Sequence, residues 1–273
     1  MAVITISRQV AAHGDEVASE LSKILDYKFI TRKDIEQRIV EGGFPAVKMP
    51  KFDERKPGFF ASLTKERDEY LNYAQYAILE AASKGNVIII GRGAFTVLQN
   101  VPNNISIRLI ADESTRIQRL KEEFSWDDKK ALQRIKESDT NREGFHNSFY
   151  NINIDDPSLY HAVLNTGKNS IEDTAKIIAD IVKIQITKEL EEKGTVAVKE
   201  LLQAQTVVNK LYFEKKVNIE FMHATVEGKT VTLHGVSDSP AVVEQALQFI
   251  KEEMSGYDAK YAVSIVHAFK NYT

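Results

Sequence analysis

Polar and basic side chains follow two apolar runs in the first third of the chain. The run 3–6 leads into a segment that contains Ser7, Arg8, His13, Gly14, Asp15 and Glu16, and the run 87–90 leads into Gly91, Arg92 and Gly93. At the carboxyl ends of parallel strands, helix N-termini and arginines readily bind anions. Together with residues 165–167, which follow a third run, these segments predict a site for a phosphorylated ligand.

The candidate residues differ in how strongly their surroundings favour a functional role. Glycines on both sides favour a binding role for Arg92, because a surface ion pair rarely needs them. Arg8 fits a phosphate contact and an ion pair with Asp15 or Glu16 equally well. His13 is interpreted as a loop residue rather than a catalyst, since no second histidine or nucleophile accompanies it at a useful spacing.

The elements that position these residues alternate between strand and helix. The apolar spacing predicts strands at 3–6, 87–90, 105–110 and 160–164, and helices at 14–25, 31–40, 63–84, 112–124, 126–142 and 170–192. Thr31 and Asp34 form a T-x-x-D capping signal at the start of the second helix. The alternation predicts an α/β fold, a doubly wound parallel sheet.

Residues 41–62 interrupt this alternation with several glycines and prolines and a basic composition. Such a composition is typical of a surface excursion. We expect an insertion in the sheet domain that acts either as a lid or as an arm in a homodimer.

The pattern changes again after the charged stretch 189–194, which ends in a glycine. We therefore predict two domains, residues 1–193 and residues 194–273. The second begins with a helix at 196–211, continues with two strands around the turn at Glu227 and Gly228, and ends with a helix at 240–254 and a strand at 261–266. This αββαβ order is sufficient for a small α+β domain.

Composition excludes several classes of function. With 36 Lys and Arg against 39 Asp and Glu, the net charge of −3 argues against a nucleic-acid partner. No run of about 18 apolar residues is present, so we expect no transmembrane segment and a cytoplasmic location. The chain has no cysteine, and its six histidines show no close metal-ligand spacing, so no protein-bound metal centre is predicted.

Four short motifs make residues 1–183 resemble the cytidylate kinase-like branch of the P-loop nucleoside monophosphate kinases. They are Ile4-Thr-Ile-Ser-Arg8, Ile90-Gly-Arg-Gly-Ala94, Asp139-Thr-Asn-Arg142 and Leu164-Asn-Thr166. The resemblance implies ATP as donor with Mg²⁺, held by the loop from Ser7 to Glu16. It also implies that Arg92 binds an acceptor monophosphate and that a helical lid closes over the transferred group through Arg134 and Arg142. Asp139 would orient a lid arginine or the metal shell.

The loop departs from the pattern of that branch. Ala11, Ala12 and His13 stand where the branch has Gly-Ser-Gly, and no P-loop lysine is present. This departure predicts weak triphosphate binding. Two functions stay open: a phosphotransferase that moves a phosphoryl group from ATP to a CMP-like acceptor, and a nucleotide-binding regulatory protein that signals through its C-terminal domain.

The C-terminal domain is similar to the BON domain. The similarity rests on Val231-Thr-Leu-His-Gly235 after a turn and on Gly256 before the last strand. It implies a membrane surface or another protein as the partner of this domain.

Overall fold

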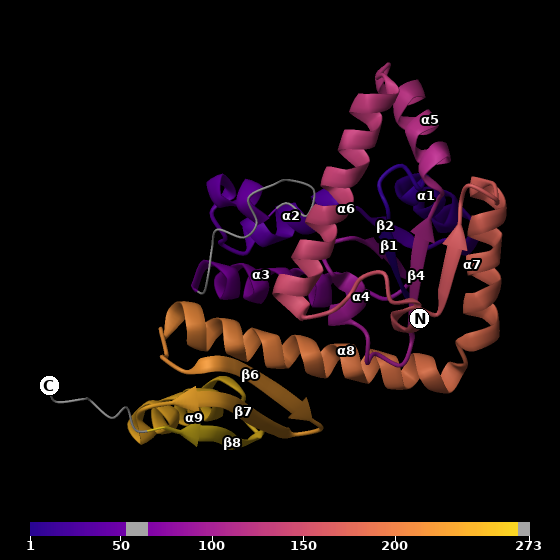
Figure 1. Cartoon of the computed structure of the whole chain (residues 1–273). Coiled ribbons are helices and arrows are strands. Elements are labelled where there is room, and N and C mark those ends of the chain that lie inside the picture. Colours follow the sequence, from indigo (N-terminus) through magenta and orange to yellow (C-terminus); the bar gives the residue numbers. More distant parts are fainter. Residues whose placement is uncertain (53–64, 267–273) are drawn as a thin grey trace, which may run out of the picture. The chain divides into compact units, whose positions relative to one another are not determined.

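A computed structural model describes residues 1–52 and 65–266 (Figure 1). The chain divides into two compact units, Met1–Thr195 and Val196–Thr273. In the described part of the chain, no helix combines the length and apolar character needed to cross a membrane.

The N-terminal unit is built on a five-stranded parallel sheet with the order β2-β3-β1-β4-β5. Its strands are β1 (Val3–Arg8), β2 (Lys28–Ile30), β3 (Val87–Ile90), β4 (Asn104–Ile110) and β5 (Ala162–Asn165). Every residue of β1 and β3 is buried, as their continuous apolar sequences require. The predicted parallel α/β sheet is thereby confirmed.

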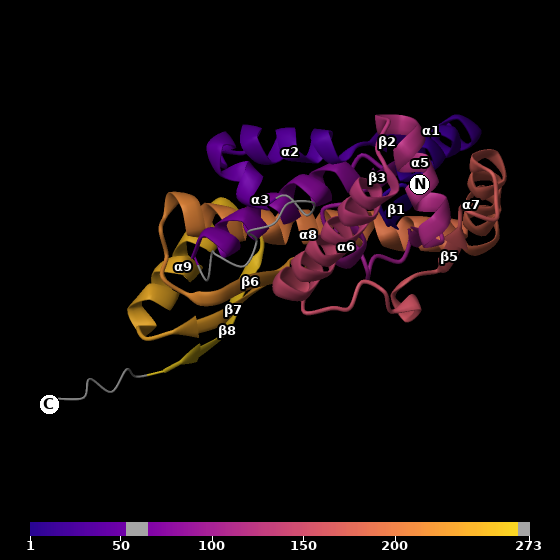
Figure 2. The same cartoon turned by 45° about the horizontal axis from the view of Figure 1, so that its top comes forward.

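Helices cover both faces of this sheet (Figure 2). On one face, α1 (Gly14–Leu25) and α7 (Ile171–Gln185) pack on alternate residues of the central strands, among them Ile4, Ile88 and Ile107. On the other side, α3 (Lys65–Ala82) contacts β3, and the short α4 (Ala94–Val97) contacts β1. Helices packed on both faces of the sheet thus fix the positions of the carboxyl ends of its strands.

The first part of the predicted insertion is a compact turn next to α2. Helix α2 (Arg32–Glu41) begins with the expected capping box, in which the Thr31 side chain and the Asp34 carboxylate each accept a backbone N–H. It is followed by the 3₁₀ helix η1 (Ala46–Phe52), which buries Phe52. The rest of the insertion, residues 53–62, lies outside the described residues, so its predicted role as lid or arm stays a prediction.

A helical hairpin follows β4, made of α5 (Glu113–Phe124) and α6 (Asp128–Tyr150) (Figure 1). Each helix begins at an aspartate, Asp112 and Asp127, whose carboxylate caps it. The second helix extends eight residues beyond the predicted end at Arg142. After it, the short 3₁₀ helix η3 (Pro157–Leu159) leads into β5.

The predicted helix over 170–192 is wrong in one respect, because it is two helices. Ile186 is extended and ends α7, and the Thr187 hydroxyl accepts the Leu190 amide at 3.2 Å, which starts α8 (Lys188–Asn209). Helix α8 continues through Gly194, so the charged stretch before this glycine is helical. A Cβ at Gly194 would lie 1.9 Å from Asn103 Oδ1, which explains the glycine by close packing.

The C-terminal unit has a small mixed sheet in the order β6-β7-β8. After the end of α8 and the π-helical turn η4 (Lys210–Glu214) come β6 (Glu220–Glu227), β7 (Thr230–Ser237), α9 (Pro240–Glu253) and β8 (Asp258–Ile265). Strand β7 pairs antiparallel with β6 and parallel with β8. Leu211, Val231, Leu233 and Ile250 are central residues of its separate core.

We expect a fragment of residues 1–195 to fold without the remaining chain. The main core of the N-terminal unit draws its side chains from residues 2–186, and the core of the C-terminal unit draws its own from residues 204–263. Two separate cores predict two independent folding units. A cooperative thermal transition of the fragment, followed by circular dichroism, checks this expectation, and a molten fragment contradicts it.

Candidate functional site

The segment between β1 and α1 is a tight loop with left-handed backbone. Ala11 and His13 have φ of 59° and 52°, a region that alanine and histidine rarely adopt. His13 is the N-cap residue of α1, and its Nδ1 lies 3.4 Å from a Glu16 carboxylate oxygen. Ala11 and His13 therefore hold a backbone conformation that glycine adopts without strain, so the loop is strained at these two residues.

Replacing Ala11 by glycine is expected to raise the free energy of unfolding by about 0.5–1 kcal/mol. Relief of the left-handed conformation is worth roughly 1–2 kcal/mol, against about 0.5–1 kcal/mol of added chain entropy in the unfolded state. Ala12→Gly is the matched control, since Ala12 is buried and has no positive φ, so it should lose stability. Urea unfolding followed by the fluorescence of Trp126, the single tryptophan, measures both changes. A loss of stability in Ala11→Gly contradicts the assigned strain.

A cavity of about 810 Å³ opens between this loop and the α5–α6 hairpin. A volume of this size is suitable for a nucleotide. The loop side of the cavity is formed by Arg8 and residues 9–16, and the hairpin side by Arg119, Leu120, Glu122, Glu123, Phe124, Trp126, Arg134 and Arg142.

The charged groups of the cavity differ in their exposure. Arg8 and Arg142 are buried, and Arg119 and Arg134 are half-buried, whereas Asp15, Glu16, Glu122 and Glu123 are exposed. Water screens the exposed carboxylates, while charges inside the cavity act through a medium of lower dielectric constant. The interior of the cavity is therefore suited to an anion.

Arg119 joins the loop to the segment that follows β5. Its guanidinium donates to the Ala11 carbonyl oxygen at 2.9 Å and to the Thr166 carbonyl oxygen at 2.6 Å. The Thr166 hydroxyl in turn donates to the Ala12 carbonyl oxygen at 3.2 Å. Partial burial lowers the pKa of Arg119, but arginine stays protonated at neutral pH. Two of the three segments that the sequence brings to the carboxyl edge thus meet through one arginine.

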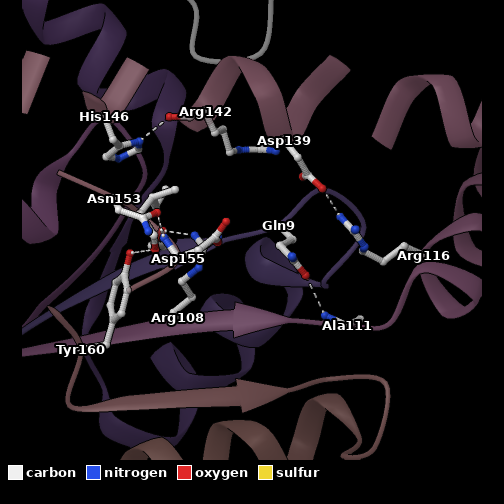
Figure 3. A network of polar contacts seen from close by, with 12 residues as sticks. Gln9, Arg108, Ala111, Arg116, Asp139, Arg142, His146, Asn153, Asp155 and Tyr160 are labelled. Carbon is white, nitrogen blue, oxygen red and sulfur yellow. Dashed lines mark hydrogen bonds and ion pairs between the residues drawn. The ribbon is translucent and has the colours of Figure 1, made fainter. Parts of the chain in front are cut away.

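The predicted lid residues divide into two groups, and Figure 3 shows Arg142 and Asp139 from them. Arg134 and Arg142 line the cavity, and Arg142 donates to the Ser138 hydroxyl one turn earlier in α6. Asp139 instead accepts a hydrogen bond from Arg116 of α5 at 2.8 Å. Asp139 thus joins the two helices of the hairpin and is absent from the cavity wall.

Arg92 does not line the cavity and is buried among residues of α2, η1 and α3. Its side chain is 1% exposed and donates to the Glu36 carboxylate, the Phe52 carbonyl oxygen and, at 3.1 Å, the Tyr70 hydroxyl. Backbone conformation and close packing also explain why glycines flank Arg92. Gly91 and Gly93 have φ of 79° and 73°, and a Cβ at Gly93 would lie 2.4 Å from the Tyr150 ring.

A second polar cluster surrounds Arg108, which the sequence analysis did not single out (Figure 3). This buried arginine of β4 donates to the Ser7 hydroxyl at 2.9 Å and to the Asp155 carboxylate. Its guanidinium carbon lies 6.0 Å from the centre of the Tyr160 ring, whose hydroxyl pKa is raised by burial. A charged residue within an otherwise apolar strand pattern is the signal that could have revealed it.

Comparison with known proteins places this geometry in a family. The model of the cytidylate kinase-like family matches residues 3–168. The chain belongs to this family. The cytidylate kinase of Pyrobaculum islandicum is 26% identical over 185 residues, which cover 67% of this chain and 93% of that protein. That of Methanocaldococcus jannaschii is 29% identical over 125 residues, 45% of this chain and 68% of its own length.

A solved structure supports the fold of the cytidylate kinase-like unit. An uncharacterized protein from Eubacterium ventriosum superposes with a TM-score of 0.54 at 22% identity, covering 67% of this chain and 98% of its own. At this level of identity the likeness concerns the fold alone. The family match ends at residue 168, before the C-terminal unit begins.

Within this cytidylate kinase-like fold, the structure brings together only part of the predicted site. The cavity gathers the residues Arg8, His13, Gly14, Asp15, Glu16, Arg134 and Arg142. The residues Ser7, Gly91, Arg92, Gly93 and Asp139 do not line it. Gly14 lies under the Arg8 side chain, where a Cβ would come within 2.7 Å of Arg8 Cγ. Arg119 is the cavity residue whose importance the sequence analysis missed.

The cavity wall fits a nucleotide with its metal better than a bare metal ion. Within residues 1–52 and 65–266, no three His, Asp or Glu side chains form a group able to hold a metal. Mg²⁺ in nucleotide sites is held largely by phosphates and water with one or two carboxylates. In this cavity Asp15 and Glu16, at the start of α1, are the carboxylates beside the loop.

Proposed function

We propose that the N-terminal unit transfers a phosphoryl group from ATP to a CMP-like nucleoside monophosphate. The observation that carries this proposal is the cavity, in which the loop before α1 faces the arginines of the α5–α6 hairpin. Phosphoryl transfer depends on positioning and on neutralising spread negative charge, which fixed arginines do well.

In this proposal the donor phosphates lie at the N-terminus of α1. Arg8 contacts them from the end of β1, and Arg134 and Arg142 reach the transferred group from α6. Arg119 and Asp139 act as positioning residues, because Arg119 holds the loop carbonyl and Asp139 holds the hairpin through Arg116. Mg²⁺, bound through the donor phosphates, would supply further positive charge at the same place.

The acceptor monophosphate would bind at Arg92. This guanidinium already meets a carboxylate, that of Glu36, in a buried setting. A phosphate offers the same planar fork a similar pair of oxygens. Acceptor binding then requires the ion pair between Glu36 and Arg92 to break. Glu36 retains its ion pair with a second cation, Arg32, at 2.7 Å.

A coupled assay of ADP formation over a panel of nucleoside monophosphates tests the proposal. We expect turnover with ATP and Mg²⁺ that is fastest with CMP or dCMP. Turnover with none of the panel, with ATP bound nonetheless, overturns the enzyme and favours the nucleotide-binding regulatory protein. The strained Ala11-Ala12-His13 loop is the feature on which that second function rests.

Trp126 reports donor binding separately from turnover, because it lines the cavity and is the single tryptophan. We expect a saturable change in its fluorescence as ATP is added. Arg8→Ala should raise the half-maximal ATP concentration at least tenfold, because a charge-assisted hydrogen bond is worth about 1.5–3 kcal/mol. Lys121→Ala is the matched control, since this α5 cation pairs with Asp128 and is absent from the cavity wall. An equal ATP response in the parent and in Arg8→Ala removes Arg8 from the donor site.

For the C-terminal unit we propose a BON-like binding role. The αββαβ order and the mixed sheet support it. Binding of the purified unit to vesicles, measured by sedimentation, tests the membrane-surface partner, and absence of binding favours a protein partner.

A further inference from the structure

Two histidines face each other on the small sheet of the C-terminal unit. His223 of β6 and His234 of β7 are direct partners in the antiparallel register. The next pair along, Ala224 and Leu233, points the other way, toward the core that includes Leu233. The histidines therefore lie on the outer face of the sheet.

The two imidazole rings are close and parallel. Their centres are 4.7 Å apart and their planes differ by 7°. The register shifts between Glu220 and His223, and Phe221 in this irregular stretch has a φ of 52°. Such bulges redirect side chains, and here the bulge directly precedes His223.

Hydrogen bonds engage one nitrogen of each ring. His223 Nδ1 lies 3.0 Å from the Phe221 carbonyl oxygen. A carbonyl oxygen only accepts, so Nδ1 carries the proton and Nε2 presents its lone pair. His234 Nε2 lies 3.3 Å from the Thr225 hydroxyl, which directs its Nδ1 away from this contact. Metal-binding histidines have the same arrangement, with the second nitrogen held by a carbonyl or another polar group.

The histidine pair has a small residue as a neighbour on the adjoining strand. On the other side of His234, the residue in register on β8 is Ala262, which has a small side chain. The nearby cation Lys260 lies 3.4 Å from the Asp258 carboxylate.

We propose that His223 and His234 form a binding site for a divalent first-row transition-metal ion that prefers imidazole, such as Zn²⁺. The rings turn from stacked to splayed, so that Nε2 of His223 and Nδ1 of His234 each approach the ion to about 2.0–2.1 Å. Since no third His, Asp or Glu joins a metal-binding group in the described residues, water completes the coordination. The site is open and exchangeable, and it is independent of the kinase proposal. This proposal departs from the sequence prediction that the chain has no protein-bound metal centre.

Calorimetric titration of the full chain, without a polyhistidine tag, with ZnCl₂ tests the site. We expect one Zn²⁺ per chain and at least a tenfold loss of affinity in His223→Phe and in His234→Phe. Phenylalanine keeps the stacked pair but has no ring nitrogen, so it separates metal binding from cross-strand packing. Thr232→Val, on the same face of β7, is the matched control and should bind Zn²⁺ as the parent does.

Two results overturn the proposal: a parent chain that binds no Zn²⁺ at micromolar concentrations, and a double phenylalanine variant that binds it like the parent. Imidazole NMR signals of the unaltered chain give a second measurement that needs no variant. Zn²⁺ should shift the signals of His223 and His234 and leave that of His161, which accepts the Ser106 amide through Nδ1, in place. Equal shifts of all histidines also overturn the site.

Discussion

Replacing Arg142 by alanine is expected to lower kcat for phosphoryl transfer from ATP to CMP by about 10³-fold. This side chain is buried and lines the cavity from α6. Its guanidinium donates a hydrogen bond to the Ser138 hydroxyl one helical turn earlier, which supports its position. An arginine that meets the charge of a transferring phosphoryl group is worth roughly 10³–10⁵ in rate. Arg142→Lys keeps the charge but loses the fork, so we expect it to recover only part of the rate.

Ser138→Ala provides the matched control for this prediction. It removes the hydroxyl that accepts from Arg142 but leaves the guanidinium in the cavity wall, so kcat should fall less than tenfold. The Trp126 unfolding transition shows whether each variant keeps its fold. A folded Arg142→Ala protein with kcat within tenfold of the parent would falsify the assignment of Arg142 to the transferred group.

The α/β architecture was predictable because apolar periodicity records burial directly. The run Val87–Ile90 is continuous and its strand is buried on both faces, while Thr31 and Asp34 mark a helix start that the structure confirms. The end of α7 was missed because the N-cap at Thr187 is a single side chain within an otherwise helical pattern. Gly194 was interpreted as the end of the charged stretch before the domain boundary. The structure explains this glycine by close contact with Asn103 rather than by helix termination.

The site was predictable to the extent that its residues follow one another in the chain. Arg8 to Glu16 form a continuous loop and meet in one cavity. Arg119 lies on an amphipathic helix, where sequence alone does not distinguish a solvated cation from one that donates a hydrogen bond to the Ala11 carbonyl oxygen. Its role depends on how the hairpin folds back toward the loop, which is a tertiary property.

The histidine pair lies between these two cases. A turn at Glu227 and Gly228 was predicted, and the register that follows from it places His223 opposite His234. The spacing of histidines along the chain hides this pair because the two residues belong to different strands. Counting register outward from a predicted turn would have found it.

Replacing Arg92 by alanine is expected to lower the free energy of unfolding by about 3 kcal/mol and to weaken CMP binding more than tenfold. The stability loss follows because the variant leaves the Phe52 carbonyl and the Tyr70 hydroxyl without this donor in a buried setting. Removing one partner of a buried ion pair costs roughly 3–5 kcal/mol. Because Arg32 still pairs with Glu36, we expect a loss at the lower end of this range. Urea unfolding and calorimetry with CMP measure the two effects.

Glu36→Gln separates the binding role of Arg92 from its structural role. The glutamine keeps an oxygen near the guanidinium but has no charge, so it competes less well with a phosphate for Arg92. If Arg92 binds the acceptor, this variant should bind CMP several-fold more tightly than the parent, opposite in sign to Arg92→Ala, while losing a smaller part of the stability. If Arg92 only supports the fold, both variants lose stability and the folded proteins bind CMP as the parent does. The sign of the change in Glu36→Gln therefore decides whether Arg92, the most deeply buried arginine among the described residues of the unit, recognises substrate.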